Sequence, residues 1–229
     1  MNYLTLVQRL KRESARSGSV PASLIGLAGD DLLLATWIAD AWLEVQRKRI
    51  NWDWMRKSVS GPLVIGQQGY TLAQLDVAAP ALARWQAAGY DYWPAIYRAG
   101  VPAVPYRLIY LGYEQFRDEY IVRPDIQSQP NFWTIAPDKR ILLSPRPDAV
   151  YTLKADYWAA PTALALDTDE PDMPEQHHLL LVWRALQELA GFDAAPEVDA
   201  RANRNLRMAW ADLHADQAPQ MQLGYAPLF

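Results

Sequence analysis

The chain has 229 residues, a formal net charge of −4 and no cysteine. Apolar residues make up 51% of it and charged residues 21%, proportions typical of a folded globular protein rather than a disordered one. The lack of cysteine excludes disulfides, thiolate metal sites and cysteine nucleophiles, and the acidic balance disfavours a nucleic-acid binder, whose phosphate contacts need positive charge.

Two amphipathic helices are predicted at the start of the chain. The first runs from Asn2 to about Ser17, because apolar residues recur there at helical spacing. The second is predicted to be capped by Asp30 or Asp31 and to end in the basic run "RKR", which the helix dipole favours. Its apolar stripe is formed by Leu34, Trp37, Ile38, Ala41, Trp42 and Val45.

Two tryptophans follow the basic run, in "RKRINWDWMR". Trp52 and Trp54 could form a stacking platform for nucleic-acid bases or for sugars, or a structural corner together with Arg49. The corner is the favoured interpretation, because the chain is acidic as a whole and tryptophans also occur on its helical stripes.

The middle of the chain has a strand-like pattern. A first hairpin is predicted in "SVSGPLVIGQQGYTL", turning between Gly66 and Gly69, followed by a short helix over residues 80–88. "YRLIYLG" indicates a strand and "YEQFRDEYI" a short helix. A second hairpin is predicted around Pro137-Asp138-Lys139, and a half-buried strand in "YTLKADYW".

Two further helices are predicted after an acidic, proline-containing link. The first is expected to end at Gly191, and its stripe includes Leu179, Val182, Trp183, Leu186, Leu189 and Ala190. The second carries Val198, Ala202, Leu206, Ala209 and Leu213. Beyond it, "DQAPQMQLGYAPLF" cannot continue as a long helix, because prolines interrupt it.

A search for chemistry finds no catalytic, cofactor-binding or metal-binding motif. The adjacent His177 and His178 point about 100° apart on a helix, so they are predicted to be surface residues at a helix start. No stretch reaches the roughly 18 apolar residues of a membrane span, and the first residues lack a signal-peptide core, so no membrane partner is expected. The protein is therefore not expected to be an enzyme, and no cofactor is expected.

The order of patterns resembles the head–tail adaptor (connector, or neck) proteins of tailed bacteriophages. "ADAWLEVQRKRINWDWMR" is similar to their second helix and its closing Trp motif, and a strand ending in "GQQGYTL" follows. "YEQFRDEYI", "NFWTIAPDKRILLSPRPDAVYTLKADYWAAPTAL" and "DTDEPDMPEQHHLLLVWRALQELAGFDAA" continue the pattern over nearly the whole chain. The stretch "QSQPNFW" departs from it, since a glycine is expected near the proline.

This resemblance implies a structural virion protein without a catalytic site. Such proteins form a ring, usually dodecameric, beneath the portal, extend the DNA channel and dock the tail. The implied partners are other copies of the chain, the portal protein and a tail or neck protein, with DNA met only in transit. The implied location is the neck of the virion, after assembly in the host cytoplasm. Alternatives are another tail component, such as a tail terminator or baseplate adaptor, or a virion carbohydrate-binding module.

The predicted fold class is α+β: terminal helices packed as one bundle, with an inserted antiparallel β-rich module. The predicted domains are residues 1–56 with 174–217 for the bundle, 57–166 for the β-rich module, 167–173 for the acidic linker and 218–229 for the tail. Two sets of candidate site residues remain. The acidic set, for the lumen or rim of a ring or for a plain surface loop, is Asp167, Asp169, Glu170 and Asp172. The apolar tail set, for the portal, a neighbouring subunit or the chain's own surface, is Met221, Leu223, Tyr225, Leu228 and Phe229.

Overall fold

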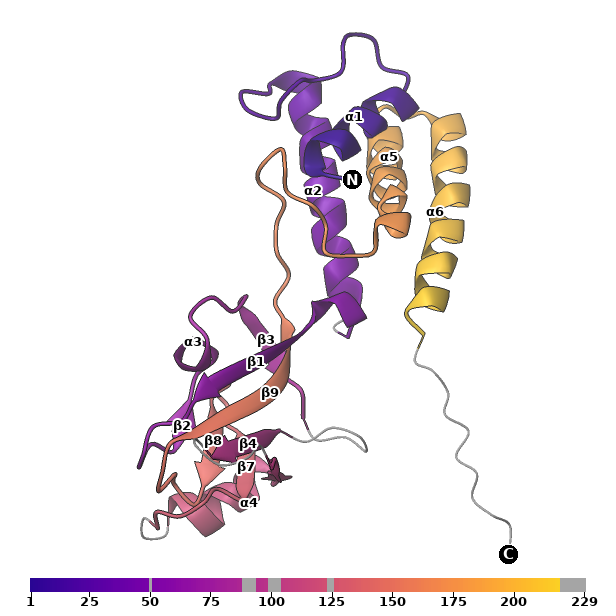
Figure 1. Ribbon diagram of the computed structural model, residues 1–229. Coiled ribbons are helices and arrows are strands. Elements are labelled where there is room, and N and C mark those ends of the chain that lie inside the picture. Colours follow the sequence, from indigo (N-terminus) through magenta and orange to yellow (C-terminus); the bar gives the residue numbers. More distant parts are fainter. Residues whose placement is uncertain (50, 88–93, 99–103, 123–125, 219–229) are drawn as a thin grey trace, which may run out of the picture. The chain divides into compact units, whose positions relative to one another are not determined.

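The chain divides into two compact units, one built from its two ends and one from its middle (Figure 1). The fold is that of a computed structural model, which describes residues 1–49, 51–87, 94–98, 104–122 and 126–218. A helical unit joins residues 1–54 to the described residues from 161 onward, and residues 55–160 form a β-rich unit.

The helical unit is organised around one central helix. It contains α1 (Tyr3–Glu13), α2 (Gly29–Lys48), α5 (Leu179–Phe192) and α6 (Pro196–Asp216), with a short turn η3 (Glu175–His177) before α5. Helix α5 packs against α1, α2 and α6, so it is the element that holds the other three together. Its sequence explains this position, because apolar side chains cover most of its circumference. Those that are buried are Leu180, Leu181, Val182, Ala185, Leu186, Leu189 and Ala190.

Helix α1 is fixed by local signals at both ends. The Asn2 side chain caps it by accepting a hydrogen bond from the Thr5 amide at 2.9 Å. It stops at Glu13, earlier than the predicted Ser17, because Ala15 adopts a left-handed conformation with φ of 53°. The predicted apolar face is confirmed, since its residues are all buried; they are Tyr3, Leu6, Val7 and Leu10.

The aspartates at the start of α2 do not cap the helix as predicted. The helix begins at Gly29, and its N-cap Ala28 offers no side-chain hydrogen bond. Asp31 instead accepts a hydrogen bond from Lys11 at 2.7 Å, which ties α1 to α2. Asp30 pairs with Arg16 at 2.7 Å. Both carboxylates still lie in the first turn, where the helix dipole favours negative charge.

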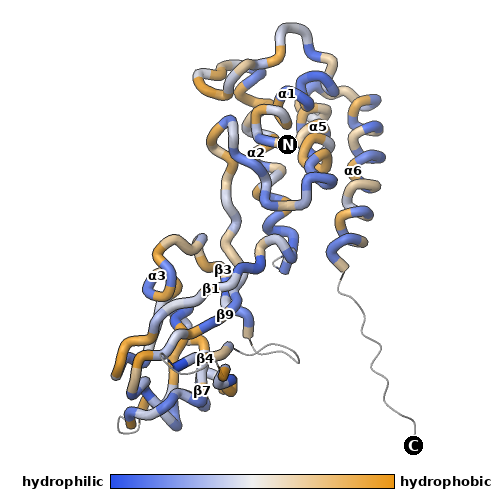
Figure 2. Tube along the Cα trace, viewed as in Figure 1, coloured by the Kyte–Doolittle hydropathy of each residue, from blue (hydrophilic) through white to orange (hydrophobic). Residues whose placement is uncertain are grey.

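The apolar stripe predicted for α6 is partly confirmed. Ala202, Leu206 and Leu213 are buried, whereas Val198 and Ala209 are half-buried. The helix alternates hydrophilic and hydrophobic residues along its length (Figure 2), as a helix with one covered face should. Pro196 occupies its first turn, where a missing amide hydrogen costs nothing.

The β-rich unit contains two sheets. The first has the order β1 (Arg56–Pro62), β9 (Tyr151–Ala159), β4 (Ala95–Arg98), β5 (Tyr106–Arg107), with β3 (Leu82–Trp85) also paired to β9. The second has the order β2 (Gly69–Tyr70), β8 (Ile141–Ser144), β7 (Phe132–Ile135), β6 (Ile109–Tyr110). All pairings between these strands are antiparallel except that of β6 with β7. The short helices are α3 (Leu72–Leu75) and α4 (Tyr113–Phe116), and α4 continues as η2 (Arg117–Ile121).

Strand β9 is the spine of the first sheet. It pairs along its length with β1 on one side, from Arg56 opposite Trp158 to Pro62 opposite Thr152, and with β3 and β4 on the other. The predicted alternation is confirmed, since the inward side chains are buried in the core of the unit; they are Tyr151, Leu153, Ala155 and Tyr157. Trp158, on the other face of the strand, is also buried, with its indole N–H donating to Gln86 Oε1 at 3.0 Å.

The first predicted hairpin is wrong. Its two arms lie in different sheets, because β1 pairs with β9 and β2 pairs with β8. Gly66 does turn the chain, with φ of 76°, but the turn passes from one sheet to the other. The Tyr70 hydroxyl holds this turn by donating to the Val64 carbonyl at 2.9 Å and accepting from the Val64 amide at 3.0 Å. A long-range partner strand thus overrode the local hairpin pattern.

The predicted helix over residues 80–88 is also wrong. Residues 82–85 form β3, because β9 offers them a partner edge. A helix that was not predicted, α3, occurs at Leu72–Leu75, where Thr71 and Gln74 form a capping box. The second hairpin is confirmed: β7 and β8 pair antiparallel around a turn in which Lys139 has φ of 65°. The helix predicted in "YEQFRDEYI" is confirmed as α4 with η2.

The predicted fold class is confirmed. Helices from the two ends of the chain pack together, and a β-rich unit is inserted between them. The unit boundaries fall after Trp54 and Ala160, whereas the sequence predicted boundaries after residues 56 and 166. Residues 161–170 belong to the helical unit, and their backbone explains why: the Asp169 carbonyl accepts from the Tyr3 amide at 2.7 Å.

Candidate functional site

Trp52 is the centre of an aromatic cluster at the end of α2. Its side chain is fully buried, and its indole N–H donates to the Val45 carbonyl at 2.8 Å. Its ring stacks on Trp54, with centroids 4.6 Å apart and planes inclined by 14°. From α6, Trp210 and His214 complete the cluster at 6.4 Å and 5.6 Å from Trp52. The cluster thereby joins the end of α2 to the end of α6.

The basic run is also engaged within the helical unit. The Arg49 guanidinium lies 5.3 Å from the centre of the Trp52 ring and donates to the Gln217 carbonyl at 3.1 Å. The Lys48 ammonium lies 4.5 Å from the centre of the Trp210 ring. Gln217 also accepts a hydrogen bond from the Asp53 amide at 3.1 Å. These contacts are cation–π and backbone interactions that fix a chain crossing.

This geometry suits packing rather than recognition of a flat ligand. A stacking platform must present an open ring face, and Trp52 is covered by Trp54, Trp210 and His214. Two of the three cations of the basic run, Lys48 and Arg49, already face rings of the cluster. The role of Trp52, Trp54 and Arg49 as a structural corner stays a prediction, which substitution can test.

Two of the four acidic candidates accept hydrogen bonds from backbone amides of the same unit. Asp167 Oδ1 accepts from the Leu24 amide at 2.9 Å, which anchors the loop before α2. Asp169 Oδ2 accepts from the Ala165 and Leu166 amides, both at 2.8 Å, and closes a turn. The hydrogen bonds from Leu166 and Ala165 hold the pKa of the Asp169 carboxyl below its ordinary value, because they stabilise its charged form.

Glu170 and Asp172 differ from that pair, because both are exposed. They lie in the link that precedes η3, so this short stretch presents negative charge at the surface of the helical unit. The set of four was predicted as a group for a lumen or rim. The structure separates it into two side chains that bind backbone amides and two exposed ones, and the lumen or rim role stays a prediction.

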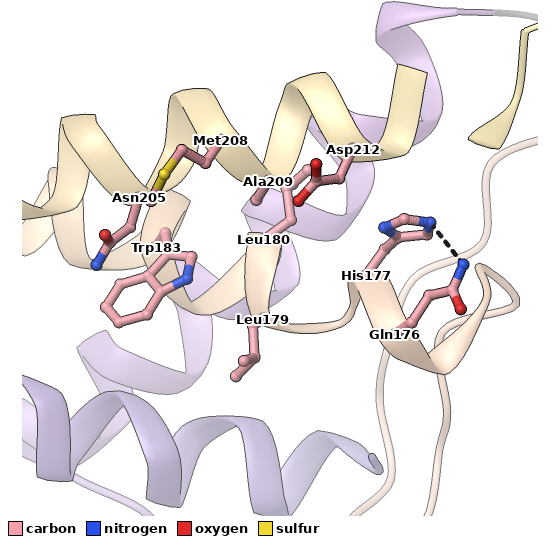
Figure 3. A pocket seen from close by; sticks show the side chains of 9 residues that line it. All are labelled: Gln176, His177, Leu179, Leu180, Trp183, Asn205, Met208, Ala209 and Asp212. Carbon is pink, nitrogen blue, oxygen red and sulfur yellow. Dashed lines mark hydrogen bonds between the residues drawn. The ribbon is translucent and has the colours of Figure 1, made fainter. Parts of the chain in front are cut away.

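A groove lies between η3–α5 and α6 in the helical unit (Figure 3). Its volume is about 320 Å³, and its sides are mainly apolar. Leu180 is buried, Trp183 is half-buried, and Leu179 and Met208 are exposed by 37% and 56%. The groove is lined by Gln176, His177, Leu179, Leu180, Trp183, Asn205, Met208, Ala209 and Asp212.

The two ends of the groove differ in chemistry. At one end His177 and Gln176 lie together, and at the other Trp183 lies beside Asn205 (Figure 3). His177 Nε2 is 3.2 Å from Gln176 Nε2 and 3.3 Å from Asp216 Oδ2 in the last turn of α6. Hydrogen bonds from Gln217 and from His177 hold the pKa of the Asp216 carboxyl below its ordinary value. The groove therefore combines an apolar middle with a polar end beside the end of α6.

The sequence did not predict this groove. Leu179 and Trp183 were placed on the apolar stripe of α5, but the buried face is rotated away from them. Their spacing of four residues, opposite Asn205, Met208 and Ala209 on α6, is the only sequence signal for it. That signal is the same for an internal stripe and for an open groove, so sequence alone cannot separate them.

The adjacent histidines are buried, contrary to the prediction that they lie on the surface. His178 is exposed by only 2%, and its Nε2 lies 2.9 Å from the Met173 carbonyl, to which it donates. Burial lowers the pKa of the His178 imidazole, because the charged form loses solvation. The cause of the wrong prediction is η3, whose turn directs both rings inward.

Among the described residues, no group of three potential metal ligands comes together. In the same part of the chain, none of the helices combines the length and apolar character needed to cross a membrane. The tail set of Met221, Leu223, Tyr225, Leu228 and Phe229 lies outside the described residues.

A family model described as SU10 adaptor protein matches residues 1–227. A comparison with curated proteins found no match.

Proposed function

The chain belongs to the SU10 adaptor protein family of phage head–tail adaptors, and from that premise we propose that it forms a dodecameric ring under the portal. In this role it extends the DNA channel and docks the tail. The observation that carries the proposal is the match over residues 1–227, which includes both the helical and the β-rich unit. The family is one of structural adaptors, which implies a non-enzymatic role in the virion.

The amino-acid composition of the chain supports a function that depends on protein–protein interfaces. It contains 10 Trp and 12 Tyr against 4 Phe, and Trp and Tyr are favoured in interfaces because one end of the ring tolerates water. Large apolar side chains remain exposed on the single chain, as a closed ring with heterologous interfaces requires. In the β-rich unit they include Ile109, Ile121, Val122 and Ile126, and in the helical unit Leu179, Phe192 and Met208.

The charge of the chain suits DNA in transit. A net charge of −4, repeated around a ring, repels phosphates rather than binding them. Glu170 and Asp172 are the acidic candidates whose side chains are exposed, so they are the residues proposed for the lumen or rim. Asp167 and Asp169 are proposed to act there only indirectly, by holding the link in place.

The tail set is proposed to contact the portal or a neighbouring subunit. Met221, Leu223, Tyr225, Leu228 and Phe229 are large and apolar, and residues 219–229 contain no charged side chain. Such a segment gains free energy when another surface covers it. Removal of Met221–Phe229 is expected to abolish binding to the portal or to weaken the ring, and unchanged assembly would contradict this part of the proposal.

The mass of the assembled particle tests the proposal as a whole. The purified full chain is measured by native mass spectrometry, alone and after mixing with the portal protein of the same phage. A particle of twelve chains bound to the portal is the expected result. A six-fold ring would indicate a tail terminator or baseplate adaptor instead, and a monomer that binds glycans would indicate a carbohydrate-binding module.

A further inference from the structure

Two surfaces of the helical unit have the same spacing of side chains, namely the outer face of α2 and the groove between α5 and α6. On α6 the groove is lined at positions 205, 208, 209 and 212. On α2 a shallow hollow is lined at positions 40, 43, 44, 47 and 48. Both sets contain the spacing i, i+3, i+4, i+7, which is how one helix contacts another helix that lies along it.

Each surface carries one charged side chain that has no partner in the described part of the chain. Arg47 lies at the end of the α2 face, and Asp212 lies on the α6 wall of the groove (Figure 3). Both are exposed, and neither forms an ion pair or hydrogen bond with another described residue. The neighbours of Arg47 differ, because Glu44 pairs with Arg184 and Lys48 lies over the Trp210 ring. The two remaining charges are of opposite sign.

An apolar side chain lies at the middle of each surface. Leu43 is half-buried between Asp40 and Arg47, and Met208 is 56% exposed in the groove that Trp183 also lines. An aliphatic side chain packs well against a thioether and an indole. Contact between the two surfaces therefore buries apolar area at its centre and places the charges near its edges, as in most protein interfaces.

The charges also decide the direction in which the two helices would lie. When α2 of one copy lies parallel to α6 of another, three pairs are aligned: Asp40 with Asn205, Leu43 with Met208, and Arg47 with Asp212. The first and last members of each set are seven residues apart, a rise of about 10 Å on either helix. The Asn205 amide can then donate to the Asp40 carboxylate. An antiparallel contact would instead bring Asp40 to Asp212, and like charges repel.

The fold itself provides the parallel direction. Helices α2 and α6 both pack against α5, and they run in the same direction through the helical unit (Figure 1). Rotation of copies about an axis along these helices keeps α2 of one copy parallel to α6 of the next. The contact uses a different surface on each copy, so every pair leaves one groove and one α2 face for further copies. A closed ring satisfies all of them.

We propose that the α5–α6 groove binds the outer face of α2 from a second copy of the chain, with Arg47 paired to Asp212. This inference rests on the proposed function in one respect, namely that the copies form a ring. It adds the two surfaces that meet and the direction in which they meet. Leu43 is the side chain that enters the groove between Trp183 and Met208.

Exchange of the two charges tests the pairing. Arg47→Asp and Asp212→Arg each place like charges opposite one another, so each is expected to raise the concentration needed for half-assembly about tenfold. The double variant Arg47→Asp, Asp212→Arg restores opposite charges between copies and is expected to assemble like the wild type. Native mass spectrometry over a concentration series measures assembly. Both side chains are exposed, so the fold is expected to be preserved, and circular dichroism checks it.

Arg204→Asp is the matched control for these variants. Arg204 is exposed on α6 and does not line the groove, so the same change of charge there is expected to leave assembly unchanged. A double variant that assembles no better than the single variants would overturn the proposal. An equal loss in Arg204→Asp would also overturn it, because the effect would then come from total charge.

The absence of cysteine allows a second, direct measurement. Chains with Leu43→Cys and chains with Met208→Cys, which carry tags of different size, are mixed in equal amounts and oxidised. The mixed disulfide dimer is expected to form about tenfold faster than in a mixture of Leu43→Cys with Ala211→Cys, because only groove contact brings the two sulfurs within reach. Ala211 is exposed on the same helix and does not line the groove. Equal rates in the two mixtures, or dimers formed as readily by either variant alone, would overturn the proposal.

The outcome is separable from that of the proposed function, because the disulfide reports the contact and the particle mass reports the ring. A particle of twelve chains that shows neither the charge rescue nor the groove-specific disulfide would refute the contact and leave the adaptor ring standing. The disulfide and the charge rescue in a particle of six chains would support the contact and contradict the dodecamer.

Discussion

At the scale of single residues, two neighbouring tryptophans of one cluster differ in burial and in hydrogen bonding. Trp52 is fully buried and hydrogen-bonded to Val45, whereas Trp54 is half-buried and its indole nitrogen has no partner among the described residues. Trp52→Phe is therefore expected to lower the free energy of unfolding by about 2 kcal/mol, since it leaves a cavity and an unpaired carbonyl. Denaturation followed by far-ultraviolet circular dichroism measures this change.

Trp54→Phe is the matched control for that variant. It removes the same ring atoms but breaks no hydrogen bond, so a smaller loss, under about 1 kcal/mol, is expected. Equal losses for the two variants would contradict the central position given to Trp52 and would favour a simple stacked pair.

His178 should make the stability of the helical unit depend on pH. Burial lowers the pKa of its imidazole below the ordinary value of 6.5, so the unfolded chain takes up a proton at a higher pH than the folded chain. The contribution of His178 to the free energy of unfolding is therefore expected to be constant above about pH 6.5 and to fall as the pH decreases from there towards the pKa of folded His178. Thermal or chemical unfolding at a series of pH values measures it.

His178→Gln tests the assignment, because an amide can still donate to the Met173 carbonyl but does not titrate. The variant is expected to lose much of the decline below pH 6.5. If His178→Gln follows the wild-type curve, the pH dependence has another source.

At the scale of elements, prediction succeeded where the pattern was local. The apolar face of α1 and the hairpin of β7 and β8 depend on neighbouring residues, so periodicity and turn chemistry sufficed. It failed for the pairing of β1, which was predicted as a strand but with the wrong partner, and for the strand type of β3, because their common partner β9 follows far along the chain. The short α3 was not predicted, although Thr71 and Gln74 already have the spacing of a capping box in the sequence.

Helix α3 packs so closely against β1 that there is no room for a side chain at Gly61. A Cβ atom at this position would lie 2.3 Å from the Leu75 carbonyl oxygen, so a side chain there must displace the backbone of α3. Gly61→Ala is expected to destabilise the β-rich unit by about 1–3 kcal/mol. Gly112→Ala, where a Cβ atom meets nothing within 4 Å, should change little. Urea denaturation of both variants makes the comparison, and similar midpoints would contradict the close packing.

The hydrogen bonds of the acidic link, residues 167–173, can be tested by substitution. Asp167→Ala removes the acceptor for the Leu24 amide and is expected to cost about 1 kcal/mol of unfolding free energy. Glu170→Ala, at an exposed position in the same link, should leave stability unchanged. Chemical denaturation distinguishes them. A loss in Glu170→Ala equal to that in Asp167→Ala would show that the link acts through its charge rather than through hydrogen bonds.

At the scale of the whole molecule, the sequence was sufficient to predict the fold class and the protein family, but not the features of the protein surface. The order of helices, strands and helices was sufficient for an α+β fold with an insertion, and the family match confirms the head–tail adaptor resemblance. The groove could not be predicted, because a half-buried Trp183 and a buried tryptophan look alike in sequence. Likewise, four acidic residues in one link gave no sign that two of them bind backbone amides.

The discontinuous helical unit has a consequence for synthesis on the ribosome. Helices α1 and α2 leave the exit tunnel long before α5, the helix against which both of them pack. The β-rich unit, by contrast, is contiguous, and its first strand pairs with its last, so it is complete as soon as β9 has been translated. The nascent chain therefore carries an uncovered apolar face on α1 throughout that interval, which makes it a natural client for a chaperone.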